Sequence, residues 1–138
     1  MNARQLSLLK GPRQKGEWPA PALEFETQCM VADSLRRGVK PGWLWTAFPA
    51  GELRSKETAA RVKRMGLNPG FFDLLLIDPN GVHRWLELKR GRAPLTEEQA
   101  AFSLAMQARG VPCEVARSYQ GAIDVLNGWD ALRLTVSA

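Results

Sequence analysis

Three residues of this chain could do chemistry together: the carboxylates Asp73 and Glu87 and the amine Lys89. Glu87 and Lys89 are two residues apart in an apolar run, and side chains two apart on a strand lie on one face of a sheet. Carboxylate oxygens are the ligands that Mg²⁺ and Mn²⁺ prefer, and a nearby lysine can orient a water or stabilise the charge of a phosphate. These residue types indicate metal-assisted hydrolysis.

The turn at residues 78–81 decides whether the two carboxylates meet. Its Asp-Pro-Asn-Gly sequence suits a type I turn followed by a left-handed glycine, which gives a three-residue hairpin loop with a bulge. Asp78 would then face Val82, and Asp73 would lie opposite Glu87 with Cβ atoms roughly 4.5–5.5 Å apart. A two-residue loop would place the carboxylates on opposite faces. On geometry alone, an exposed charge ladder without a catalytic role is an equal alternative.

The surrounding pattern predicts an α/β protein in which a mixed central sheet is flanked by helices. Apolar spacings of three and four indicate helices, and short apolar or aromatic runs between Gly and Pro indicate strands. The expected order is helix, strand, helix, strand, strand, helix, strand, helix. Helices are expected at residues 22–37, 55–65, 97–109 and 119–126, and strands at 43–48, 71–77, 82–89 and 113–117.

Composition predicts one domain, at residues 21–138, behind a basic N-terminal arm at residues 1–20. The 138 residues are 45% hydrophobic and 24% charged, which suits one soluble globular core. The arm carries scattered Lys and Arg among Gly and Pro without periodicity. It is either a loose basic tail or an arm that touches phosphates or a second subunit.

Charge and cysteine content narrow the classes of partner and compartment. The net charge of +5 favours a polyanionic partner such as DNA, although many basic proteins share it. The two cysteines, Cys29 and Cys113, lack neighbours at metal-ligand spacing and are expected to be reduced thiols rather than a zinc site. No apolar run approaches the roughly 18–20 residues of a membrane span, and none suits a signal peptide, so a cytoplasmic location is expected.

A run of polar and basic residues between the first and second predicted strands is a candidate DNA-binding surface. The alternative is an ordinary solvated helix face. The candidate contacts to phosphates are Arg54, Ser55, Lys56, Arg61, Lys63 and Arg64.

Glu24 and Gln99 are candidates to support the central site. Glu24 and Gln28 are four apart on the first helix and share one face, with Glu26 as a rival. Gln99 either binds the scissile phosphate or a water near Lys89, or completes a capping box with Thr96; the two interpretations are equally supported. The single histidine lies just after the turn and is expected at the surface.

Taken in order, these blocks resemble the VRR-NUC branch of the PD-(D/E)XK nuclease superfamily. The resemblance covers roughly residues 23–127. The matching blocks are Glu24 with Gln28, Pro49-Ala50-Gly51 with Arg54-Ser55, Gly66 and Gly70 before Asp73, Glu87-Leu88-Lys89, Leu95-Thr96 with Gln99, residues 110–115, and Ser118. One departure is Phe72, which stands where the family has a proline before the aspartate.

The resemblance implies a restriction-endonuclease-like fold and hydrolysis of DNA phosphodiesters with Mg²⁺ or Mn²⁺. It implies that Asp73, Glu87 and Leu88 hold the metal, that Lys89 assists the attacking water, and that Glu24 and Gln99 support them. Single-domain members of this kind resemble phage proteins that form homodimers and act on branched DNA, as Holliday junction resolvases do. A module that binds branched DNA without cutting it is the main alternative, and an RNA-processing enzyme is a further one.

Overall fold

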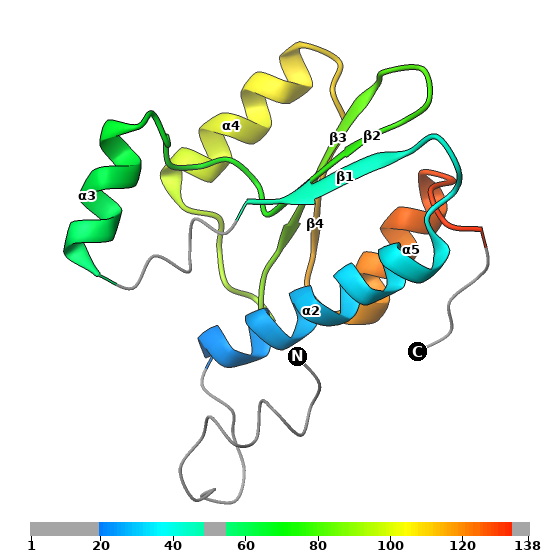
Figure 1. The fold of residues 1–138 in the computed structure, drawn as a ribbon, viewed down its shortest axis with the longest axis horizontal. Helices are drawn as coiled ribbons and strands as arrows, with labels where there is room; N and C mark the ends of the chain where they lie inside the picture. The colour runs from blue at the N-terminus through cyan, green and yellow to red at the C-terminus, as the bar shows by residue number, and fades with distance from the viewer. Residues whose placement is uncertain (1–19, 49–54, 134–138) are drawn as a thin grey trace, which may run out of the picture. The chain divides into compact units, whose positions relative to one another are not determined.

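The computed structural model describes residues 20–48 and 55–133, and its helices and strands follow the predicted order (Figure 1). The helices are α2 (Ala20–Gly38), α3 (Lys56–Arg64), α4 (Glu97–Ala108) and α5 (Tyr119–Gly128). The strands are β1 (Leu44–Ala47), β2 (Leu74–Ile77), β3 (His83–Leu88) and β4 (Cys113–Ala116). The proposed arm lies outside the described residues, so its two interpretations stay predictions.

The strands form a mixed sheet in the order β1-β2-β3-β4. β1 pairs antiparallel with β2, and β2 pairs antiparallel with β3. The Trp85 amide donates to the Pro112 carbonyl (3.0 Å) and the Lys89 amide to the Ala116 carbonyl (2.9 Å). Because the donor and the acceptor both advance by four residues, β3 and β4 run parallel. The predicted α/β class with a mixed sheet is confirmed.

The β2–β3 hairpin has the predicted three-residue loop. Ile77 pairs with His83, which is the register that follows when Asp78 faces Val82. The amide of Asp78 donates to the Val82 carbonyl (3.0 Å), and Gly81 has a φ of +83°. That left-handed backbone favours glycine, so the turn sequence sets the register of the strands on either side.

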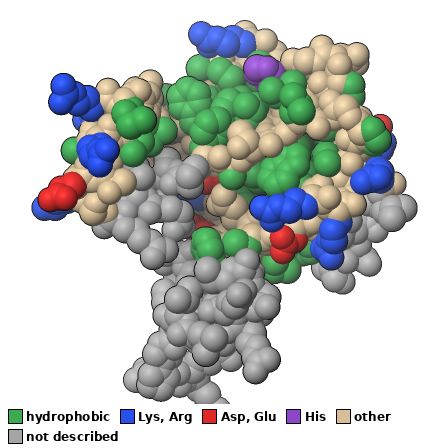
Figure 2. All heavy atoms as spheres, in the orientation of Figure 1, with side chains coloured by type: hydrophobic (Ala, Val, Ile, Leu, Met, Phe, Trp, Pro, Cys, Tyr) green, Lys and Arg blue, Asp and Glu red, His purple; other side chains and the backbone are tan. Residues whose placement is uncertain are grey.

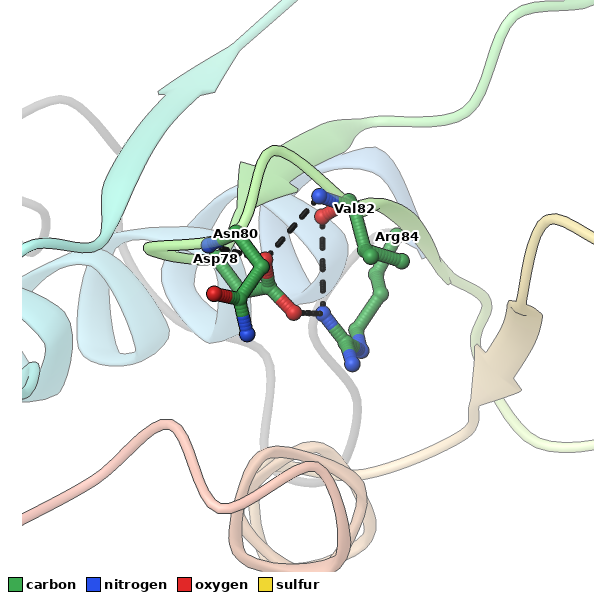
Figure 3. Close-up of polar contacts among 4 residues, drawn as sticks. All are labelled: Asp78, Asn80, Val82 and Arg84. Atoms are coloured by element: carbon green, nitrogen blue, oxygen red, sulfur yellow. Dashed lines mark hydrogen bonds and ion pairs between the residues drawn. The ribbon is translucent and has the colours of Figure 1, made fainter.

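Polar contacts of the Asp78 side chain hold this turn rigid (Figure 3). Its Oδ1 accepts hydrogen bonds from the Asn80 amide (2.8 Å) and the Val82 amide (2.9 Å), and its Oδ2 accepts one from Arg84 Nη1 (2.8 Å). The hydrogen bond from Arg84 contributes most to lowering the pKa of the Asp78 carboxyl. The Arg84 guanidinium also lies 5.1 Å from the centre of the Trp43 ring.

The strand β2 begins at Leu74, so the prediction of a strand from residue 71 is wrong for its first three residues. Gly70, with a φ of +98°, turns the chain just before them. Phe72 is fully buried and its ring lies 5.3 Å from that of Phe102 in α4. Burial of this aromatic side chain therefore takes precedence over the local preference for extended structure.

The described chain divides into two compact units. The first contains α2, residues 88–92 and α5, together with the end of β4. Within it α2 and α5 pack together, with Leu35 and Ile123 among their fully buried side chains. The Ser34 hydroxyl, also fully buried, is 2.7 Å from the Tyr119 hydroxyl, which satisfies both groups.

The second unit contains β1, α3, β2, α4 and most of β3 and β4. An aromatic cluster of Phe72, Trp85 and Phe102 forms its core. Phe48 stacks on Trp85 with ring centres 5.6 Å apart, and Phe71 lies edge-on to the same indole. These rings fix the segment that leads into Asp73, because large aromatic side chains bury much area with few rotamers.

Candidate functional site

Within the second unit, the hairpin register places Asp73 opposite Glu87. Leu74 pairs with Leu86, and the next position along both chains is Asp73 against Glu87. The Asp73 carbonyl accepts a hydrogen bond from the Phe48 amide (2.8 Å), which anchors this position to the end of β1. Glu87 is only 2% exposed and Asp73 is half-buried. The predicted register is therefore confirmed by the pairs of residues 74–77 with 83–86, and its continuation by one position sets Asp73 opposite Glu87.

Gln99 contacts the Glu87 carboxylate and also caps its own helix. Its Nε2 donates to Glu87 Oε2 at 2.7 Å, while its Oε1 accepts from the Thr96 amide at 3.0 Å. The Thr96 hydroxyl accepts in return from the Gln99 amide at 3.1 Å, so the capping box is confirmed. Gln99 therefore caps α4 and also lies beside the acidic residue Glu87. The sequence did not identify Glu87 as its hydrogen-bond partner.

The donor chemistry of the pair suits a hard divalent cation. Magnesium retains several waters and takes only one or two protein carboxylates, which is what Asp73 and Glu87 supply. Among the described residues, no group of three or more His, Cys, Asp or Glu is placed to hold a metal ion. Within the described part of the chain, a further ligand beside this pair would therefore be a neutral oxygen. Leu88 has a hydrocarbon side chain and could contribute only its backbone carbonyl.

Lys89 and Glu24 lie in the first unit, where both line one pocket of about 200 Å³. Leu88 lines it as well. Neither Gln28 nor the rival Glu26 is among its lining residues, so the structure favours Glu24 over Glu26. The ammonium of Lys89 and the carboxylate of Glu24 therefore share a cavity, as a supporting role for Glu24 requires.

Sequence reasoning missed the other residues of this pocket, which are Thr27, Arg90 and Arg117. Thr27 is three residues after Glu24 on α2, and this helical spacing could have identified it. Arg90 directly follows Lys89 in the chain. Arg117 follows β4, and only the tertiary fold brings it to the pocket.

The basic helix α3 is exposed along its length. It contains no buried residue, and Ser55 caps its start by accepting a hydrogen bond from the Thr58 amide at 3.0 Å. Figure 2 shows Lys and Arg side chains gathered over this helix. The exposed cations are Lys56, Arg61, Lys63 and Arg64. Arg54, the remaining candidate contact, lies outside the described residues, as does the Pro49-Ala50-Gly51 block.

Other groups weighed from the sequence have structural roles. Ser118 caps α5 by accepting a hydrogen bond from the Gly121 amide at 3.0 Å, and His83 is exposed as predicted.

Cys29 and Cys113 are both free thiols. Burial, followed by the charge of Glu114, raises the pKa of Cys113 to about 11, which disfavours the thiolate form that metals bind. None of the described helices combines the length and apolar character that a membrane crossing requires.

Comparison with known proteins identifies the fold. No protein-family model matches the sequence, and no curated protein matches it. One solved structure described as a VRR_NUC domain protein is 25% identical with a TM-score of 0.60, covering 84% of this chain and 90% of that one. Another, described as a VRR_NUC domain, is 23% identical with a TM-score of 0.51, covering 76% of this chain and 94% of that one. The chain therefore has the fold of VRR_NUC domains.

Proposed function

We propose that this chain is a deoxyribonuclease that depends on Mg²⁺ or Mn²⁺ and whose site is built on Asp73, Glu87 and Lys89. The similarity to VRR_NUC structures suggests a nuclease domain. The observation that carries the proposal is the buried carboxylate of Glu87 in register with Asp73. Burying a carboxylate beside another is unfavourable unless a cation or hydrogen-bond donors offset it, and a metal-dependent hydrolase has a use for such a pair.

Each residue has a distinct task in this proposal. Asp73, Glu87 and the Leu88 carbonyl would hold the cation, which when bound polarises the phosphodiester and makes water more acidic. Gln99 is a positioning residue, because its amide fixes the orientation of the Glu87 carboxylate. Lys89, two residues after Glu87, would bind the scissile phosphate and orient the attacking water.

Hydrolysis then proceeds by in-line attack of water on phosphorus. A new P–O bond forms from the water oxygen, the ester P–O bond breaks, and a proton reaches the leaving oxygen. Glu24 lies in the pocket of Lys89 and can accept a proton from the water or orient the ammonium group.

The proposed substrate is branched DNA, cut by a homodimer in the manner of a Holliday junction resolvase. The net charge of +5 and the exposed cations of α3 support a polyanionic partner. The preference for junctions, the homodimer, membership of the PD-(D/E)XK superfamily and a phage-type origin rest on the family resemblance. Two strands of a junction must be cut in concert, for which a dimer provides two sites.

The alternative is a module of the same fold that binds branched DNA without cutting it. A calorimetric titration with Mn²⁺ separates the two, because a pure binder has no reason to hold a cation between carboxylates. Saturable Mn²⁺ binding that is lost in Asp73→Asn supports the nuclease, and its absence in the wild type contradicts it. A panel of junction, flap, splayed and duplex substrates, with matched RNA, then identifies the preferred nucleic acid.

A further inference from the structure

Phe71 is the most exposed aromatic side chain among residues 20–48 and 55–133. It is 48% exposed, whereas each of the other phenylalanine, tyrosine and tryptophan side chains in these ranges is half-buried or buried. An apolar ring left in water forgoes the favourable free energy of burial. Single exposed apolar residues are nevertheless common on proteins, so the surroundings of this ring decide whether it has a function.

Two core rings fix the position of the Phe71 ring. Its centre lies 4.6 Å from that of Phe102 in α4 and 5.7 Å from that of Trp85 in β3, to which it is edge-on. Trp85 and Phe102 belong to the aromatic core and contact each other edge-on, with ring centres 5.0 Å apart. Because Phe71 has this rigid support, binding a flat partner would order little that is not ordered already.

The face of the sheet that carries Trp85 also carries the carboxylates of the proposed metal site. Trp85 is two residues before Glu87 in β3, and side chains two apart on a strand share a face. The register sets Asp73 opposite Glu87, and Phe71 is two residues before Asp73 in the chain. Phe71 therefore contacts the side chain that is the next neighbour of Glu87 on this face.

The ring of Phe102 places Phe71 beside the same site from α4. Phe102 is three residues after Gln99, so the two side chains lie on one face of the helix. Gln99 donates from Nε2 to Glu87 Oε2 at 2.7 Å. Contacts with two separate elements thus put the exposed ring next to the carboxylate at which the proposed cleavage occurs.

We propose that Phe71 stacks on an unpaired DNA base and thereby selects branched DNA in which the branch point exposes such a base. The inference rests on the proposed function, because the base would belong to the strand cut at Asp73 and Glu87. Every base has a flat π face, so a phenyl ring stacks on it whatever the sequence. The bases of an intact duplex are stacked on one another and offer only their edges. Phe71 would therefore favour flaps and splayed ends over fully paired duplex.

The binding test uses the full chain without divalent cation, so that it does not depend on catalysis. Fluorescence anisotropy compares a splayed duplex end with the same splayed end whose unpaired arms carry abasic sites. The abasic arms keep every phosphate and lack only the bases, so the ratio of the two affinities isolates stacking from charge. We expect the normal splayed end to bind about tenfold more tightly, as one stacked base provides. Equal binding of the two DNAs by the wild type overturns the proposal.

Phe71→Leu is the variant for this test, and Leu104→Ala is its control. Phe71→Leu keeps an apolar side chain against the core but has no flat face, so the tenfold ratio should fall below about threefold. Phe71→Tyr should retain the ratio. Leu104 is a 67% exposed apolar side chain of α4 outside the aromatic cluster, so Leu104→Ala should leave the ratio unchanged.

The ratio is measured within each variant, so a general loss of affinity or stability does not imitate the expected result. A ratio that stays near tenfold in Phe71→Leu overturns the proposal. Sedimentation of the same variant tests the other use of an exposed ring, which is contact with a protein. A change of oligomeric state in Phe71→Leu, with the base-dependent ratio preserved, would assign the ring to that contact and also overturn the proposal.

A cleavage assay with Mn²⁺ distinguishes failure of this inference from failure of the proposed function. If both hold, Phe71→Leu raises KM for the splayed end and leaves kcat within about twofold, because stacking is shared by the ground and transition states. Base-dependent binding without cleavage of any DNA would keep the stacking role of Phe71 and refute the nuclease. Cleavage by a protein that binds normal and abasic arms equally would keep the nuclease and refute the stacking role.

Discussion

The side-chain amide of Gln99 donates a hydrogen bond of 2.7 Å to the buried carboxylate of Glu87. The other end of the same amide accepts from the Thr96 backbone, so the first turn of α4 fixes its orientation. A neutral amide donor satisfies one carboxylate oxygen without neutralising the charge, which is compatible with the cation-binding role that we propose for Glu87. The cap of one helix thereby orients a residue of the central strand.

Replacing Gln99 should weaken metal binding as well as stability. Gln99→Ala is expected to lower the free energy of unfolding by about 2 kcal/mol, since it leaves a buried carboxylate with one donor fewer. It should also reduce Mn²⁺ affinity by roughly tenfold, as loss of a group that orients a metal ligand does. Urea denaturation and calorimetry measure the two effects.

Thr96→Ala is the matched control for this prediction. It removes the hydroxyl of the capping box and should cost about 1 kcal/mol, but it retains the backbone donor that holds Gln99. Mn²⁺ affinity should therefore stay within about twofold of the wild type. An equal loss of affinity in both variants would show that Gln99 acts only through the stability of α4.

Gly70→Ala should destabilise the protein more than Gly66→Ala. Both glycines have positive φ, +98° and +110°, so alanine is strained at each. A Cβ at Gly70 would lie 2.6 Å from the Glu98 carbonyl oxygen, whereas one at Gly66 meets nothing within 4 Å. We expect a loss of about 3 kcal/mol for Gly70→Ala and about 1 kcal/mol for Gly66→Ala by urea denaturation. Equal losses would refute the close approach to α4.

The ion pair of Asp78 and Arg84 should make the hairpin sensitive to acid. The hydrogen bond from Arg84 lowers the pKa of Asp78 below its ordinary value of 3.8. A folded-state pKa that is depressed gives stability above the unfolded-state value, and that stability is lost as pH falls through the folded-state value. Asp78→Asn should therefore be less stable than the wild type at pH 7, and the difference should shrink below about pH 4. A difference that is constant from pH 7 to pH 2.5 would contradict this.

Neutralising the cations of α3 should weaken DNA binding in a salt-dependent way. Because the helix has no buried residue, Arg61→Ala and Lys63→Ala should leave the unfolding midpoint unchanged. Each should reduce the slope of log K against log salt by about 1 if it contacts a phosphate. Glu57→Ala on the same helix changes charge in the opposite sense and should not weaken binding. Unchanged slopes in both cation variants would exclude α3 from the DNA interface.

The hairpin shows how far local sequence determines this structure. The Asp-Pro-Asn-Gly turn was sufficient to predict the loop length and the register that sets Asp73 opposite Glu87, since few turn types accept those residues. The Thr96 capping box was equally local and equally predictable. Spacing of apolar residues predicted the order of the remaining elements.

Features that depend on tertiary packing were not predictable in the same way. Residues 71–73 have the composition of a strand, but they lie outside β2 because Phe72 is buried against Phe102. Arg117 reaches the pocket of Lys89 only because β4 runs parallel to β3. The hydrogen bond from Gln99 to Glu87 likewise joins positions 12 residues apart, and no local pattern names its acceptor.

The most direct test of the proposed nuclease is single-turnover cleavage of an end-labelled four-way DNA junction with Mn²⁺. The assay compares the wild type with Lys89→Ala, and fluorescence anisotropy measures junction binding by both proteins. We predict cleavage by the wild type, loss of at least about 100-fold in rate for Lys89→Ala, and binding within about threefold. Cleavage by Lys89→Ala at the wild-type rate, or none by the wild type on junction, flap, splayed or duplex DNA, would contradict the account.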